Sequence, residues 1–72
     1  MPTQPDLLIR KLIEKLADHD PRVRRNAAGA LRLHGRRAVP AIPALAVLLT
    51  DEDPRVRCEV ERALDHLQSR AA

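Results

Sequence analysis

Three histidines and one cysteine are the side chains best suited to metal binding or nucleophilic catalysis in this 72-residue chain. His19, His34 and His66 lie far apart and none begins a His-Glu pair, whereas metal sites need closely spaced ligands. Cys58 is expected in the first turns of a helix, where a thiol can be activated, but no histidine is near it in sequence to act as a base. There is also no glycine-rich phosphate loop and no nucleophile elbow. We therefore predict no metal site, no cofactor and no enzymatic activity.

A more specific pattern of charged residues is an internal repeat. The string Asp20-Pro21-Arg22-Val23-Arg24 returns unchanged as Asp53-Pro54-Arg55-Val56-Arg57, thirty-three residues later. Self-similarity at a period of this size is typical of stacked-repeat proteins. The same shift superimposes apolar residues spaced three, four or seven apart, as on one helical face. These are Ile9 on Ile42, Leu12 on Leu45, Leu16 on Leu49, Ala30 on Ala63 and Leu31 on Leu64.

Each copy of the repeated string predicts the start of a helix. The aspartate can accept hydrogen bonds from the free N–H groups of the first turn, and proline suits the first helical position. Gly35 is expected to end a helix in a left-handed conformation, and Thr3 and Asp6 have the spacing of a capping box. The chain is predicted to be all-α, with helices at about residues 5–18, 21–34, 40–50 and 54–69. We expect one domain, 1–72, that contains repeats at 5–35 and 38–69.

The predicted core is aliphatic, because the chain has no Phe, Tyr or Trp. Residues expected to face inward are Leu8, Ile9, Leu12, Ile13 and Leu16; Val23, Ala27, Ala30, Leu31 and His34; Ile42, Leu45, Ala46, Leu48 and Leu49; and Val56, Val60, Ala63, Leu64 and Leu67. The third helix is apolar nearly all round, so we expect it to be covered on more than one side. A bend is expected in it at Pro43.

Composition excludes several classes of protein. Apolar residues make up 44% of the chain and charges of both signs 32%, which fits helices with a solvated face better than disorder. A single cysteine cannot form an internal disulfide. No apolar run is long enough to span a bilayer, and no charged start leads into a signal sequence. We therefore predict a cytoplasmic protein without a membrane segment.

The repeat has the features of one known family of helical hairpins. A tetratricopeptide repeat would need Trp, Tyr and Phe, and the ankyrin string Thr-Pro-Leu-His is absent. The stretches Ala38-Val39-Pro40-Ala41-Ile42-Pro43-Ala44-Leu45 and Leu48-Leu49-Thr50-Asp51-Glu52-Asp53-Pro54-Arg55-Val56-Arg57 resemble HEAT-like repeats, in the short form typified by the phycobilisome-lyase HEAT-like family. The resemblance covers residues 6–68 and implies an α-solenoid fragment of two hairpins.

The resemblance also implies a role for the repeated acids and arginines. Asp18, Arg24, Asp51 and Arg57 would form a ladder of ion pairs and hydrogen bonds between neighbouring repeats. Simple geometry agrees, since an arginine in the first turn of one helix and an aspartate at the end of the preceding helix lie at the same level in stacked units. This ladder is expected to be structural.

The predicted function is a protein–protein interaction module. The resemblance places the second helix of each repeat on a concave face, where binding would use its outward residues. These are Arg25, Gly29, Arg32 and Arg36 in the first repeat, and Cys58, Glu61, Arg62 and Asp65 in the second. Because solenoids need roughly three or more repeats for stability, we also predict self-association. A two-fold dimer is the first expectation and a head-to-tail ring the second.

Nucleic-acid binding is the alternative from the same sequence. Thirteen basic residues, eleven of them arginine, give a net charge of +3. A cluster of arginines could follow phosphates along a nucleic-acid backbone. It consists of Arg22, Arg24, Arg25, Arg32, Arg36 and Arg37. Ten acidic residues and the lack of aromatic side chains for base stacking argue against this alternative.

Overall fold

The computed structural model describes residues 7–69, and this part of the chain is helical with no strand. The elements are α1 (Leu7–Lys15), α2 (Pro21–His34), the 3-10 helix η1 (Gly35–Ala41), α3 (Ile42–Val47), the 3-10 helix η2 (Leu48–Thr50) and α4 (Pro54–Ser69). The all-α prediction is confirmed. The expected start of the first helix at residue 5 and the capping-box residues Thr3 and Asp6 lie outside the described residues.

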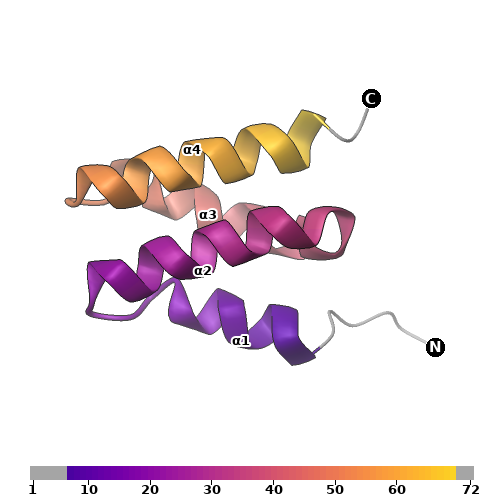
Figure 1. The fold of residues 1–72 in the computed structure, drawn as a ribbon, viewed down its shortest axis with the longest axis horizontal. Helices are drawn as coiled ribbons and strands as arrows, with labels where there is room; N and C mark the ends of the chain where they lie inside the picture. The colour runs from indigo at the N-terminus through magenta and orange to yellow at the C-terminus, as the bar shows by residue number, and fades with distance from the viewer. Residues whose placement is uncertain (1–6, 70–72) are drawn as a thin grey trace.

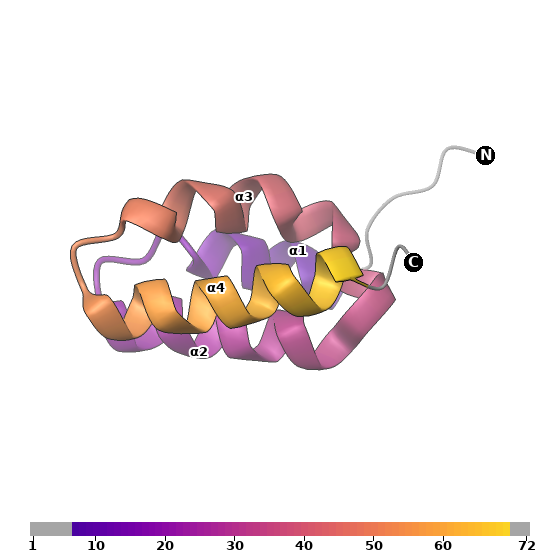
Figure 2. The ribbon, with the colours of Figure 1, turned by 90° about the horizontal axis from the view of Figure 1, so that it is seen from above.

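The helices form two hairpins that lie side by side. In Figure 1 the order across the molecule is α1, α2 and α4, with α3 behind. Figure 2 shows two layers, with α2 beneath α4 in one layer and α1 and α3 in the other. The closest packing between the hairpins is between α2 and α4, and we call this boundary the joint. The bounds predicted for the two repeats, 5–35 and 38–69, stay a prediction.

The starts of α2 and α4 follow the same local chemistry. Asp20 accepts a hydrogen bond on Oδ1 from the backbone N–H of Arg22 at 2.8 Å, and Asp53 accepts one from Arg55 N–H at 2.7 Å. A proline follows each aspartate at a position where its missing N–H costs nothing. The predicted bounds 21–34 and 54–69 are therefore confirmed. Gly35 ends α2 with φ +60° and donates its N–H to the carbonyl of Arg32.

The helical segment predicted over residues 40–50 is present, but it is not one uniform α-helix. Only Ile42–Val47 is α-helical, and 3-10 turns flank it on both sides. Pro40 and Pro43 have no N–H to donate to a preceding carbonyl, which prevents a continuous α-helix through this segment. The first helix also ends at Lys15 and not near 18, because Asp18 N–H bonds to the Lys15 carbonyl, three residues back, at 3.1 Å.

The core lies between the two layers and is made of aliphatic residues. Its buried members are Ile9, Leu16, Ala27, Ala28, Leu31, Ala38, Ala41, Leu45, Val56, Val60, Ala63, Leu64 and Leu67. All five residues predicted to face inward from α4 are among them. The prediction is wrong for Leu8, Ala46 and Leu49, which are exposed. Ala46 lies within α3 and Leu49 within η2, and Leu8 is 49% exposed.

Candidate functional site

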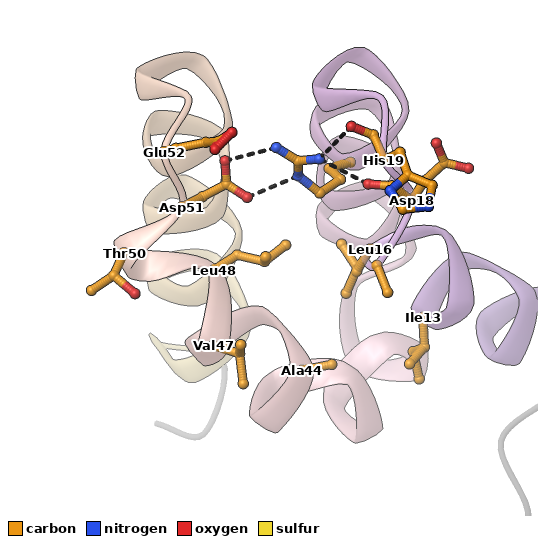
Figure 3. A pocket seen from close by; sticks show the side chains of 12 residues that line it. Ile13, Leu16, Asp18, His19, Ala44, Val47, Leu48, Thr50, Asp51 and Glu52 are labelled. Carbon is orange, nitrogen blue, oxygen red and sulfur yellow. Dashed lines mark hydrogen bonds and ion pairs between the residues drawn. The ribbon is translucent and has the colours of Figure 1, made fainter.

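An ion pair between the two turns is the most ordered polar feature of the joint. The guanidinium of Arg24 donates from Nε to Asp51 Oδ2 at 2.8 Å and from Nη2 to Asp51 Oδ1 at 3.0 Å. The two side chains are only 12% and 6% exposed. Arg24 Nη1 also donates to the carbonyls of Asp18 and His19 at 2.8 and 2.9 Å (Figure 3). One arginine therefore ties the turn of the first hairpin to that of the second.

The carboxylate of Asp51 is held in place from both sides. Asp51 Oδ1 accepts a hydrogen bond from the backbone N–H of Asp53 at 2.9 Å, which fixes the turn before α4. Hydrogen bonding from Arg24 is the main cause that lowers the pKa of Asp51 from its ordinary value. The same hydrogen bond raises the pKa of Arg24. A bidentate, charge-assisted contact of this kind fixes orientation as well as distance.

A second ion pair crosses the joint, and sequence reasoning missed it. Arg32 Nε in α2 donates to Glu59 Oε2 in α4 at 2.9 Å, and Glu59 Oε1 lies 3.7 Å from Arg62 Nη1. The side chain of Glu59 is only 15% exposed. Both cross-joint pairs connect residues twenty-seven apart in sequence. That shared separation is the signal that could have revealed Glu59.

The four residues of the expected ladder do not all meet. Arg24 and Asp51 pair across the joint, whereas the side chains of Asp18 and Arg57 bond only within their own hairpins. Asp18 Oδ1 accepts from Asp20 N–H at 2.9 Å, and Arg57 Nη1 donates to the carbonyl of Asp51. Neither side chain pairs with an opposite charge in residues 7–69. The described structure thus contains one complete rung, the pair Arg24–Asp51. We call Asp18 and Arg57, whose side chains have no charged partner in residues 7–69, the two half-rungs.

The residues of the expected partner-binding face lie along α2 and α4 and just past the end of α2. Arg36, Cys58, Glu61, Arg62 and Asp65 are exposed, and Arg25 and Arg32 are half-buried. Arg25 and Arg32 line a shallow groove of about 380 Å³ together with Asn26, Gly29, Ala30, Leu33 and Glu59. Arg32 is engaged with Glu59, so its charge is already compensated. The face therefore combines the Arg32–Glu59 pair with other charged residues and with the exposed Leu33.

A larger groove of about 740 Å³ opens at the turn end of the joint (Figure 3). Its apolar lining comes from Ile13, Leu16, Ala17, Ala44, Val47 and Leu48, and its polar lining from Asp18, His19, Arg24, Thr50, Asp51 and Glu52. The most strongly held charges in it, Arg24 and Asp51, neutralise each other. Across residues 7–69, no group of three or more His, Cys, Asp or Glu side chains could hold a metal ion. The groove therefore has a mixed wall, with six apolar and six polar residues.

Comparisons with known proteins agree with the geometry. A family model for HEAT repeats matches residues 9–72. Searches of curated proteins and of solved structures returned no match. None of the helices in the described part of the chain is long and apolar enough to cross a bilayer. The phycobilisome-lyase form of the repeat stays a prediction, since the match is to HEAT repeats in general. With two helical hairpins joined through a shared core and an acid–arginine rung, the chain belongs to the HEAT-repeat family.

Proposed function

We propose that this protein is a non-enzymatic interaction scaffold that associates with itself through the exposed faces of its repeats. HEAT repeats generally serve as protein-interaction scaffolds. The proposal places the protein in the cytoplasm, in keeping with its single, exposed cysteine. It leaves room for a second protein on the face that contains Arg25, Leu33 and Arg62.

The observation that carries this proposal is the amount of aliphatic surface left uncovered. Six large aliphatic side chains among the described residues are at least two-fifths exposed. They are Leu7 (62%), Leu8 (49%), Leu33 (78%), Val39 (44%), Val47 (72%) and Leu49 (41%). A small domain buries a limited share of its surface, so additional burial against a partner stabilises it. Within residues 7–69, Arg57 and Asp18 are also charged groups without an oppositely charged partner.

The test is a mass measurement on the full chain in solution. Sedimentation or light scattering from about 1 to 500 µM protein should give a mass that rises with concentration above the 8.1 kDa of one chain. A mass of 8.1 kDa across the whole range contradicts self-association. The interaction role would then depend on a different protein.

The nucleic-acid alternative loses support from the pairing of its arginines. Arg22, Arg24 and Arg32 each form an ion pair with a carboxylate, so half of the six clustered arginines are already compensated. Fewer cationic groups therefore remain to release counterions from phosphates. A gel-shift assay at low salt decides the matter, and retardation of a short duplex or single strand at micromolar protein would restore this alternative.

A further inference from the structure

The pair Arg24–Asp51 at the joint indicates which kind of partner Arg57 and Asp18 would each bind. A shift of thirty-three residues maps Arg24 onto Arg57 and Asp51 onto Asp18. Each arginine makes the same local contact, because Arg24 Nη1 donates to the carbonyl of Asp18 and Arg57 Nη1 donates to the carbonyl of Asp51. In Arg24, Nε and Nη2 go on to bind a carboxylate. In Arg57 these two groups have no acceptor within residues 7–69.

The carboxylate of Asp18 is held by the same local hydrogen bond as that of Asp51. Each carboxylate caps its own turn through Oδ1, with a distance of 2.9 Å to the N–H of Asp20 in one case and of Asp53 in the other. Asp51 accepts two guanidinium hydrogen bonds in addition, whereas Asp18 accepts none from a described residue. The donor and the acceptor of a second rung are therefore both held in place on one chain, one on each hairpin.

Several exposed or half-buried apolar residues correspond, at the same shift of thirty-three residues, to residues that are buried. Leu8, Leu12 and Val23 are exposed or half-buried, but their counterparts Ala41, Leu45 and Val56 are fully buried. Likewise Leu49 is 41% exposed and its counterpart Leu16 only 3%. We call the first-hairpin positions Leu8, Leu12, Asp18, Val23 and Asn26 the first outer face, and the second-hairpin positions Leu49, Arg57, Glu61 and Asp65 the second outer face.

We infer that the partner in self-association is a second copy stacked head to tail, with Arg57 of one chain bound to Asp18 of the next. This inference rests on the proposed function and specifies its interface. A two-fold dimer that pairs one outer face with itself keeps Arg57 and Asp18 apart, because they lie on different faces. A head-to-tail contact is heterologous, so it leads to a ring or to an open row of chains.

The contact between chains is weaker than the joint within a chain. Glu61 takes the place of Ala28, which is fully buried at the joint, so a charged side chain must be accommodated there. The pair Arg32–Glu59 is replaced by Asp65 opposite Asn26, where an amide can donate to a carboxylate without a full charge pair. The assembly is therefore expected to dissociate on dilution.

A charge-swap experiment tests the inference. Arg57→Asp sets a carboxylate against Asp18, and Asp18→Arg sets a guanidinium against Arg57, so each variant alone should associate at least about tenfold more weakly than wild type. An equimolar mixture should recover association, because the Arg57→Asp chain then meets the Asp18→Arg chain with opposite charges. Arg55→Asp makes the same charge change on an exposed side chain that pairs only within its own turn, and it serves as the control.

The possible results separate the two proposals. If wild type associates but the variants match it, or if the mixture does not recover, the head-to-tail contact is wrong and self-association stands. If wild type keeps the mass of one chain at every concentration, self-association itself fails. Circular dichroism checks that each variant is folded. If Arg57→Asp is not, the neutral variants Arg57→Gln and Asp18→Asn replace the pair, and both must weaken association while Arg55→Gln does not.

Discussion

The two glycines of this chain should respond in opposite directions to the same substitution. Gly29 lies inside α2 with ordinary helical backbone, whereas Gly35 ends that helix at φ +60°. A Cβ at position 29 would lie 3.4 Å from Glu59 Oε2, which is ordinary contact with the end of a flexible side chain. A Cβ at position 35 would meet nothing within 4 Å, so any penalty there comes from the backbone alone.

These two environments set the size of the change in stability expected from each substitution. Alanine is more favourable than glycine inside a helix by about 0.5–1 kcal/mol, so Gly29→Ala should raise the free energy of unfolding by about that amount. At about 4–8 °C per kcal/mol for a domain of this size, the melting temperature should rise by a few degrees. Gly35→Ala should lower the free energy of unfolding by about 1–3 kcal/mol, because an alanine at φ +60° and ψ −132° is strained.

Urea denaturation of both variants and wild type, at one fixed protein concentration, measures these changes. A decisive check repeats Gly29→Ala in a Glu59→Ala background, where the side chain nearest to the new methyl group is gone. If the gain comes from helix propensity, it persists there. Destabilisation by Gly29→Ala would refute the reasoning, since it would mean that Glu59 cannot move aside without loss of its bond to Arg32. A neutral Gly35→Ala would refute the argument from backbone strain.

Two other predictions concern the core and the pH dependence of stability. Leu31→Ala removes a fully buried side chain and should lower the free energy of unfolding by about 2–5 kcal/mol. That is a large part of the roughly 4–11 kcal/mol expected for a domain of this length. Leu33→Ala, at a site that is 78% exposed, should change the free energy of unfolding by about 0.5 kcal/mol or less in the same urea titration. The pKa of Asp51 is lowered in the folded protein from 3.8, so its stabilising contribution is present above pH 3.8 and is lost as the pH falls through the lower, folded-state pKa. Urea midpoints measured between pH 2 and 6 should fall on acidification, and Asp51→Asn should reduce that fall. An unchanged pH profile in Asp51→Asn would contradict the role given to this carboxylate.

The repeat itself was readable from the sequence because it depends on short-range chemistry. The string from Asp20 to Arg24 and its copy carry their own helix caps, so α2 and α4 begin and end where predicted. The stripe from Val56 to Leu67 repeats at helical spacing, and every predicted member of it is buried. The segment over residues 40–50 is helical as predicted, but apolar spacing does not reveal that it mixes 3-10 and α-helical turns.

The sequence by itself determined that two similar helical hairpins exist and which residues begin each second helix, since caps, prolines and helical spacing act within a few residues. Only the tertiary structure decided which acid meets which arginine. Asp18 and Asp51 have similar local sequences and the same capping hydrogen bond, yet only the carboxylate of Asp51 pairs with Arg24. The difference between them is whether another hairpin is stacked at that side, and this depends on contacts between residues far apart in the chain.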